Sequence, residues 1–147
     1  MDAKVTQDRR IVVGVDGSDH SVDALRWGVK LAEALQCGVE AIIVWSYPAP
    51  MGVEAIAFPE PSLFEESARK TLDATLDTAF GAAQPAMITK RVVEGYPAGR
   101  LLDLSKGAEM LVLGSRGHGG FVGALLGSVS RRCSEHATCP VLIVHGE

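Results

Sequence analysis

In the last third of the chain, an apolar run is followed by glycine and serine residues. Their spacing suits a phosphate site. Positions 114–117 read Gly-Ser-Arg-Gly, and after nine intervening residues come Gly127 and Ser128. Glycines allow backbone N–H groups to approach an anion closely, and the positive end of a helix that starts near Ser128 adds favourable charge. The preceding run, 110–113, is apolar and predicts a buried strand. The pattern therefore predicts a site for a nucleotide or another phosphorylated ligand.

Two better-known phosphate motifs do not occur in this sequence. The Walker A loop needs a glycine followed by lysine, and no lysine of this chain follows a glycine. The dinucleotide fingerprint needs Gly-x-Gly-x-x-Gly after the first strand, whereas the turn at 14–17 reads Gly-Val-Asp-Gly. The glycine cluster follows the fourth expected strand instead, so the motif belongs to a different class of phosphate site.

Size and composition favour a single globular domain. The 147 residues are 47% hydrophobic and 22% charged, which is typical of a chain with a buried core. The formal net charge is −4, from 14 basic and 18 acidic residues. Because there is no overall positive field, we expect no nucleic-acid partner. We also expect no membrane partner, because no run of about 18 apolar residues occurs.

The N-terminus and the cysteines indicate the compartment. Residues 1–8 are mostly polar and lack the apolar segment of a secretory signal. The three cysteines, Cys37, Cys133 and Cys139, cannot all pair, and their spacing is not that of a zinc site. We therefore expect a cytoplasmic protein without a disulfide framework.

Strand and helix patterns alternate along the whole sequence. Apolar, β-branched runs predict strands at 11–15, 39–45, 87–94, 110–113 and 141–144. Between them, apolar residues at spacings of three and four predict helices, the first with Val22, Leu25 and Val29 on its inner face. Four prolines within 46–61 predict a loop. Five apolar strands separated by four helices indicate an α/β domain whose parallel sheet is covered on both faces.

The helix boundaries follow from capping and breaking residues. We expect Ser18 to cap the first helix and Gly38 to end it. Ser62, with Glu65 three residues later, is typical of a capping box at the start of the second helix. Ser128 is expected to cap the last helix.

Four sequence elements occur in a fixed order along the chain. The first is Val-Gly-Val-Asp-Gly-Ser at 13–18, and the second is Gly-Tyr-Pro-Ala at 95–98. The third is the Gly-x2-Gly-x9-Gly-Ser pattern that starts at Gly114, and the fourth is the whole stretch from Leu111 to Val144. Together they resemble the ATP-binding subgroup of the universal stress protein family. The resemblance covers nearly the whole chain and is least close across the proline-rich loop.

The resemblance implies a fold and a place for the ligand. It implies one nucleotide-binding domain over 1–147, with an open, doubly wound, Rossmann-like sheet of strand order 3-2-1-4-5. It places the ligand at the carboxyl ends of strands 1 and 4, in agreement with the general rule for such sheets. The implied ligand is ATP, with or without Mg²⁺. The residues implied to contact it are Gly14, Asp16, Val44, Gly114, Ser115, Arg116, Gly117, Gly127, Ser128, Val129 and Ser130.

Several of these residues also have a purely structural interpretation. The glycines serve tight turns, and Ser128 caps a helix whether or not phosphate is bound. Asp16 either contacts ribose or a nucleotide-bound metal, or satisfies backbone N–H groups of its own turn. Val44 is a core strand residue as well as an implied wall of the adenine pocket. Arg116 is either a phosphate partner or a solvated charge.

The implied function is that of an ATP-binding regulatory protein in a stress response. We expect no catalytic residue, because His118 in the glycine loop has no evident Ser-His-Asp or paired-carboxylate arrangement. A slow ATPase and a dimerising protein without nucleotide are the alternatives. In the implied strand order 141–144 is an apolar edge strand, so we expect a homodimer through it.

Overall fold

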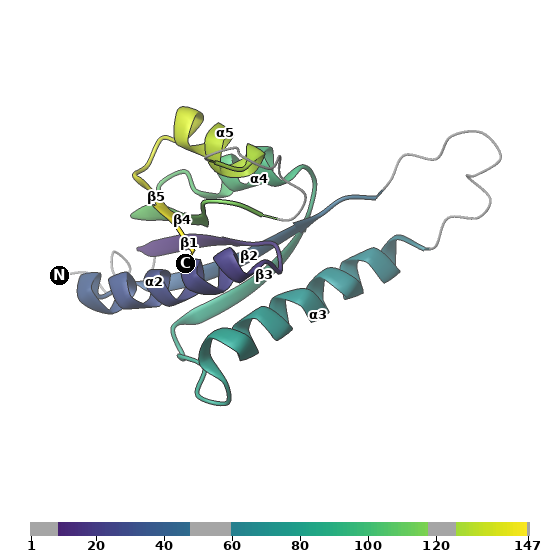
Figure 1. Ribbon diagram of the computed structural model, residues 1–147, viewed down its shortest axis with the longest axis horizontal. Coiled ribbons are helices and arrows are strands. Elements are labelled where there is room, and N and C mark those ends of the chain that lie inside the picture. The colour runs from purple at the N-terminus through teal and green to yellow at the C-terminus, as the bar shows by residue number, and fades with distance from the viewer. Residues whose placement is uncertain (1–8, 48–59, 118–125, 147) are drawn as a thin grey trace.

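Strands and helices alternate along the chain as the sequence predicts (Figure 1). The computed structural model describes residues 9–47, 60–117 and 126–146. The strands in these ranges are β1 (Arg10–Val15), β2 (Gly38–Trp45), β3 (Ile88–Glu94), β4 (Met110–Gly114) and β5 (Val141–Val144). The helices are α2 (Asp19–Leu35), α3 (Pro61–Phe80), α4 (Pro97–Leu104) and α5 (Ser128–His136). Most of the loop expected at 46–61 lies outside the described residues.

The strands form one parallel sheet in the order β3-β2-β1-β4-β5. This confirms the expected α/β class and strand order. Val13 of β1 lies opposite Ala41 of β2 on one side and Val112 of β4 on the other. The chain therefore builds outward from β1 in one direction and then in the other. The strand order reverses between β1 and β4, which is the point where doubly wound sheets bind ligands.

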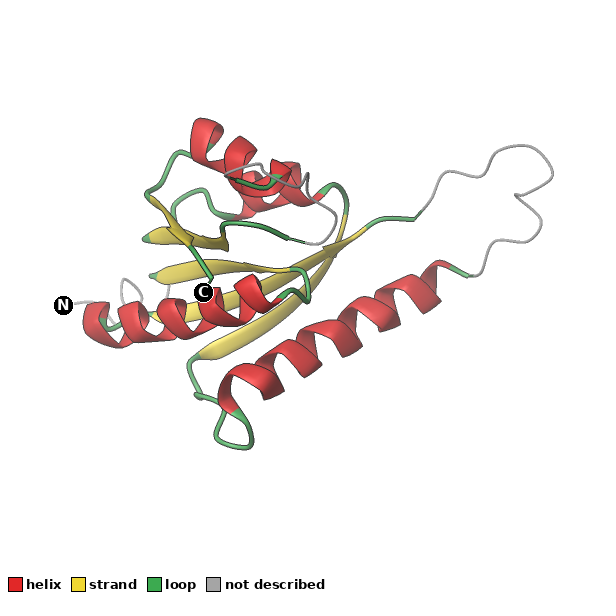
Figure 2. Cartoon of the chain, viewed as in Figure 1, coloured by secondary structure: helices red, strands yellow, loops and turns green. Residues whose placement is uncertain are grey.

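Helices α2 and α3 cover one face of the sheet, and α4 and α5 cover the other (Figure 2). Ile11 and Val13 of β1 pack in the core beneath α2 and α3, whereas Val12 packs in the core beneath α4 and α5. Because β1 is buried on both faces, its sequence is an unbroken apolar run rather than an alternating one. In the parts of the chain that the structure describes, no helix has the length and apolarity needed to span a bilayer.

Helix α2 begins where the sequence predicts and ends earlier. Ser18 is the N-cap, and its hydroxyl accepts a hydrogen bond from the Ser21 N–H at 3.3 Å. The helix ends because Gln36 takes the left-handed conformation, with φ 55°. The stop expected at Gly38 is therefore wrong, and Gly38 is instead the first residue of β2.

Helices α3 and α5 begin at residues other than those expected. Pro61 is the first residue of α3 and Glu60 is its N-cap, so the capping box expected at 62–65 is wrong. Proline suits this position because its φ is already helical and its missing N–H has no partner to lose. In α5 the N-cap is Gly127, and Ser128 is the first helical residue rather than the expected cap.

Candidate functional site

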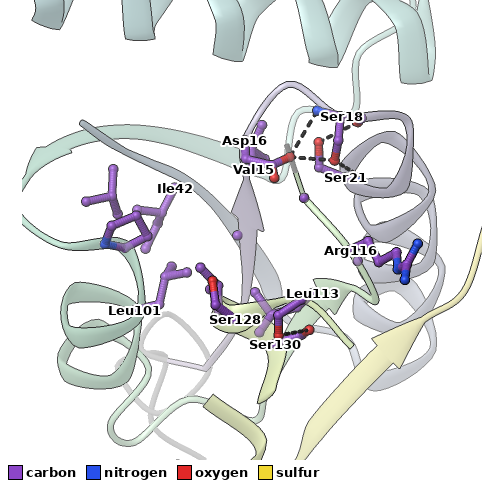
Figure 3. Close-up of a pocket in the computed structure, with 17 residues that line it drawn as sticks. Val15, Asp16, Ser18, Ser21, Ile42, Leu101, Leu113, Arg116, Ser128 and Ser130 are labelled. Atoms are coloured by element: carbon purple, nitrogen blue, oxygen red, sulfur yellow. Dashed lines mark hydrogen bonds between the residues drawn. The ribbon is translucent and has the colours of Figure 1, made fainter. Parts of the chain in front are cut away.

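A cavity of about 380 Å³ lies at the carboxyl ends of β1 and β4, where the strand order reverses (Figure 3). Ten of the eleven residues implied by the sequence line it: Gly14, Asp16, Val44, Gly114, Arg116, Gly117, Gly127, Ser128, Val129 and Ser130. The eleventh, Ser115, is not on the wall. The cavity therefore brings together segments from opposite ends of the chain.

The turn after β1 and the loop after β4 touch at Asp16 and Gly117. Oδ1 of Asp16 accepts hydrogen bonds from the backbone N–H of Ser18 at 2.9 Å and from the Ser18 hydroxyl at 2.5 Å. Oδ2 of Asp16 lies so close to Gly117 that a Cβ atom there would collide with it. Asp16 thus holds its own turn through one oxygen and faces the glycine loop with the other.

Hydrogen bonds fasten the start of α5 to the loop after β4. The Gly127 N–H donates to the carbonyl oxygen of Ser115 at 2.7 Å. The buried Ser130 hydroxyl lies 2.9 Å from the same carbonyl oxygen and 3.1 Å from that of Gly127. Because a hydroxyl has a single proton, the Ser130 side chain is committed to these carbonyls. Its backbone N–H is the group left for an anion.

The first turn of α5 forms the polar end of the cavity. Ser128, Val129 and Ser130 occupy this turn and line the wall. The N–H groups at the start of a helix have no acceptor within the helix. Ser128 is exposed, and its hydroxyl has no hydrogen-bond partner in the described part of the chain. Together with the positive end of the helix dipole, these groups favour a phosphate.

Aliphatic side chains form the other end of the cavity. Val44 and Ile42 come from β2, Pro97 and Leu101 from α4, and Leu113 from β4. In Figure 3 the Arg116 side chain points away from this apolar end. An aliphatic wall suits a flat ring such as a nucleobase, because burying the ring faces removes apolar surface from water.

Sequence analysis missed part of this apolar end. Ile42 lies two residues before Val44, so it shares one face of β2 with that residue. Pro97 and Leu101 are one helical turn apart on α4, so they also share a face. The sequence does contain a signal for these residues. The two-residue period of a strand leads from Val44 to Ile42, and the helical period leads from Pro97 in the element at 95–98 to Leu101.

Ser115 lies behind the cavity rather than on it. Its N–H donates to the carbonyl oxygen of Val144 at 2.8 Å, and its buried hydroxyl lies 3.2 Å from Nδ1 of His20. Its carbonyl oxygen accepts the hydrogen bonds from Gly127 and Ser130. Ser115 therefore holds the glycine loop in place through its hydrogen bonds. Its side-chain partner, His20, had no role in the sequence analysis.

One carboxylate of the described cavity wall, that of Asp16, is available for comparison with the donors that Mg²⁺ uses. Within the ranges that the structure describes, no group of three or more His, Cys, Asp or Glu side chains is placed to hold a metal. Mg²⁺ is usually held by one or two carboxylates together with phosphates and waters. Oδ2 of Asp16 is the carboxylate oxygen that faces the cavity loop. His118 lies outside the described residues.

Comparison with known proteins gives an assignment that is independent of this geometry. The family model described as "Universal stress protein family" matches residues 8–145. The chain belongs to the universal stress protein family. Universal stress protein Rv2623 of Mycobacterium tuberculosis is 31% identical over 141 residues, which cover 93% of this chain and 48% of that protein. Universal stress protein Rv1996 of the same organism is 34% identical over 137 residues, which cover 90% of this chain and 43% of that protein.

The chain therefore spans about half the length of the curated relatives it matches. Among solved structures, a universal stress protein in complex with cAMP is similar over 95% of this chain and 98% of that one. The TM-score is 0.71 and the sequence identity is 26%. The family assignment and the fold thus agree.

Proposed function

We propose that this chain binds an adenine nucleotide, with ATP as its ligand, in the cavity at the ends of β1 and β4. The observation that carries the proposal is the meeting of two chemically different ends in one cavity. Gly117 and the first turn of α5 form an end that favours phosphate, and Val44 and Leu101 belong to an end that suits a base. The strand order places this cavity at the switch point.

The solved relative with 26% identity supports the choice of ligand class. That protein is in complex with cAMP, which joins an adenine ring to a phosphate. The same two chemical parts match the two ends of the cavity. The preference for ATP rests on the Gly-x2-Gly-x9-Gly-Ser motif, which this chain carries in full.

The available contacts suit an affinity in the micromolar range. Hydrogen bonds to charged groups contribute about 1.5–3 kcal/mol each, and burial of the base adds to them. Association costs roughly 4–15 kcal/mol. A Kd of about 1 μM corresponds to about −8 kcal/mol, a value that lies within the range these opposing contributions allow.

We assign the cavity a regulatory binding role. Asp16 is the one carboxylate among its described lining residues, and Oδ1 of this side chain already accepts two hydrogen bonds from Ser18. The lining thus offers binding groups rather than a paired acid and base. When Mg²⁺ accompanies the nucleotide, Oδ2 of Asp16 is the protein oxygen we assign to it.

We extend the proposal to a homodimer that acts in the cytoplasm. β5 is an edge strand, and Val141, Leu142 and Ile143 are only half-buried. A half-exposed apolar edge favours pairing with a second copy. The thiols of Cys37, Cys133 and Cys139 are all unpaired, which suits a reducing compartment.

Identification of a co-purified nucleotide by mass tests the proposal. Wild-type protein is isolated gently and denatured, and the released nucleotide is quantified. We expect ATP or another adenine nucleotide in wild type and a loss of it in Gly117→Ala, because the added Cβ collides with Asp16. Gly99→Ala is the matched control, since a Cβ at that position on α4 meets no described atom within 4 Å apart from its chain neighbours and the backbone of its own helix. Wild-type protein that carries no nucleotide and takes up no added ATP would contradict the proposal.

A further inference from the structure

His20 joins three segments of the chain behind the cavity. It lies in the first turn of α2, and its Nδ1 atom accepts a hydrogen bond from the Gly146 N–H at 3.3 Å. The same Nδ1 lies 3.2 Å from the Ser115 hydroxyl. His20 also packs closely on two glycines: a Cβ on Gly114 would lie 2.5 Å from its Cβ, and a Cβ on Gly146 would lie 3.0 Å from its Cε1. The ring is thus fitted between the glycine loop and the segment after β5.

The contact with Gly146 determines which nitrogen of the neutral ring carries the proton. A backbone N–H only donates, so Nδ1 of His20 must be unprotonated and the proton of the neutral ring must lie on Nε2. In the imidazolium form Nδ1 carries a proton. It can then donate to the Ser115 hydroxyl, but the Gly146 N–H loses its acceptor. Protonation therefore removes one of these two hydrogen bonds and reverses the other.

Ser115 connects this change to the cavity. Its carbonyl oxygen accepts the Gly127 N–H at 2.7 Å and lies 2.9 Å from the Ser130 hydroxyl. Its own N–H donates to Val144 of β5 at 2.8 Å. Every polar atom of Ser115 thus has a partner, and a shift of this residue moves the start of α5. The first turn of α5 is the part of the cavity to which we assign the phosphates.

We propose that neutral His20 is a positioning residue for the phosphate end of the cavity, and that its protonation loosens the glycine loop and the segment after β5 together. The proposal rests on the nucleotide binding proposed above. Histidine is the side chain whose charge normally changes between about pH 5 and pH 8. Nucleotide affinity and the stability of the protein should therefore both contain a part that is present at pH 8 and lost as the pH falls.

Other charged groups face the same region. Asp19, Asp23 and Arg26 of α2 and His145 of the segment after β5 line one groove with His20. Arg116 adjoins Ser115 on the loop after β4. None of these groups takes part in the hydrogen bonds of Nδ1 to Gly146 and Ser115, which determine what a proton on the ring does.

Two variants of His20 separate positioning from simple packing. His20→Ala removes the acceptor at every pH. His20→Asn restores an acceptor, because the amide oxygen of asparagine takes the place of Nδ1 and does not titrate. His145→Gln is the control for the neighbouring histidine. ATP affinity is measured for all four proteins from pH 5.5 to pH 8, and each variant is compared with wild type at the same pH so that titration of the phosphates cancels.

We expect wild-type affinity to fall between pH 8 and pH 5.5 by about three- to tenfold more than that of His20→Asn, which is the effect of one lost hydrogen bond. His20→Ala should bind weakly at pH 8, and His20→Asn should recover most of the affinity. His145→Gln should keep the wild-type profile. An unchanged pH dependence in His20→Asn, or wild-type affinity in His20→Ala at pH 8, would overturn the proposal.

A second pair of measurements needs no nucleotide. Thermal unfolding of the unliganded proteins should show a loss of stability toward pH 5.5 that is smaller in His20→Asn than in wild type. Nitrogen NMR of the wild-type ring should show the proton on Nε2 at pH 8, and a proton on Nδ1 would overturn the proposal without any variant. If wild type binds no nucleotide at any pH, the proposed function fails while these two results still decide the role of His20.

Discussion

Oδ2 of Asp16 lies directly against Gly117, although these residues follow different strands of the sheet. The contact exists because β1 and β4 are neighbours at the point where the strand order reverses. It leaves no room for a side chain at position 117. The same contact places the carboxylate beside the loop to which we assign the phosphates.

Asp16→Asn separates the role of Asp16 in its own turn from its proposed role as a ligand of Mg²⁺. The asparagine Oδ1 can still accept the hydrogen bonds from Ser18, and circular dichroism should show that the variant is folded. The amide no longer attracts a cation. We expect Mg²⁺ to strengthen ATP binding to wild type and to have no effect on the variant, as measured by titration in Mg²⁺ and in EDTA. Equal strengthening by Mg²⁺ in both proteins would remove Asp16 from the metal site.

Ser128→Ala should lower ATP affinity without lowering stability, whereas Ser130→Ala should lower stability. Gly127 is the N-cap of α5, so removal of the Ser128 hydroxyl costs no cap and should leave the melting temperature unchanged. ATP affinity should fall about two- to tenfold if that hydroxyl meets a phosphate. Ser130→Ala leaves buried carbonyl groups with one donor fewer and should lower the unfolding free energy by about 1–3 kcal/mol. A destabilised Ser128→Ala protein with normal affinity would reverse these assignments.

Cys133 should be the slowest thiol to react. It is fully buried in the core beneath α4 and α5, and burial raises the pKa of its thiol to about 11. The folded state thus holds this proton more tightly than the unfolded chain. Its contribution to stability is complete below about pH 8.5 and is lost as the pH rises toward 11. Iodoacetamide labelling at pH 8, read by mass, should modify the half-buried Cys139 first and Cys133 only on unfolding, whereas equal rates would contradict this burial.

Leu142→Lys tests the proposed pairing of β5. A charge on this half-buried edge strand should shift the mass measured by light scattering toward that of a monomer. Leu63→Lys is the matched control, because Leu63 is an exposed leucine on α3. Circular dichroism should show that both variants are folded. A wild-type mass that is already monomeric, or one that Leu142→Lys leaves unchanged, argues against this interface.

The sequence predicts the strands of the sheet, because a strand that is buried on both faces is a continuous apolar run. The run at 11–15 is apolar without alternation since α2 and α3 cover one side of β1 while α4 and α5 cover the other. The order of strands came from the family resemblance, because the pattern of apolar residues carries no information on which parallel strands are neighbours. Local competition decided the helix ends: Pro61 outweighs the capping box at 62–65, and Gln36 accepts the left-handed conformation before Gly38.

Sequence analysis predicted only part of the cavity, because side-chain orientation also depends on contacts between distant segments. Glycine spacing identifies the segments that meet, but it does not say which atoms face the cavity. Ser115 belongs to the same glycine-rich stretch as Gly114 and Arg116, which line the cavity. Its side chain nevertheless points toward His20. That orientation depends on a contact between the loop after β4 and the first turn of α2, which no local pattern encodes.

Calorimetric titration of nucleotide-free protein with ATP tests the central claim most directly. We expect one site per chain with a Kd in the micromolar range. At a ligand concentration of 100 times Kd, binding should add about 2.7 kcal/mol to the unfolding free energy. Absence of heat and of any thermal shift up to millimolar ATP, ADP, AMP and cAMP would contradict the claim that this cavity is a nucleotide site.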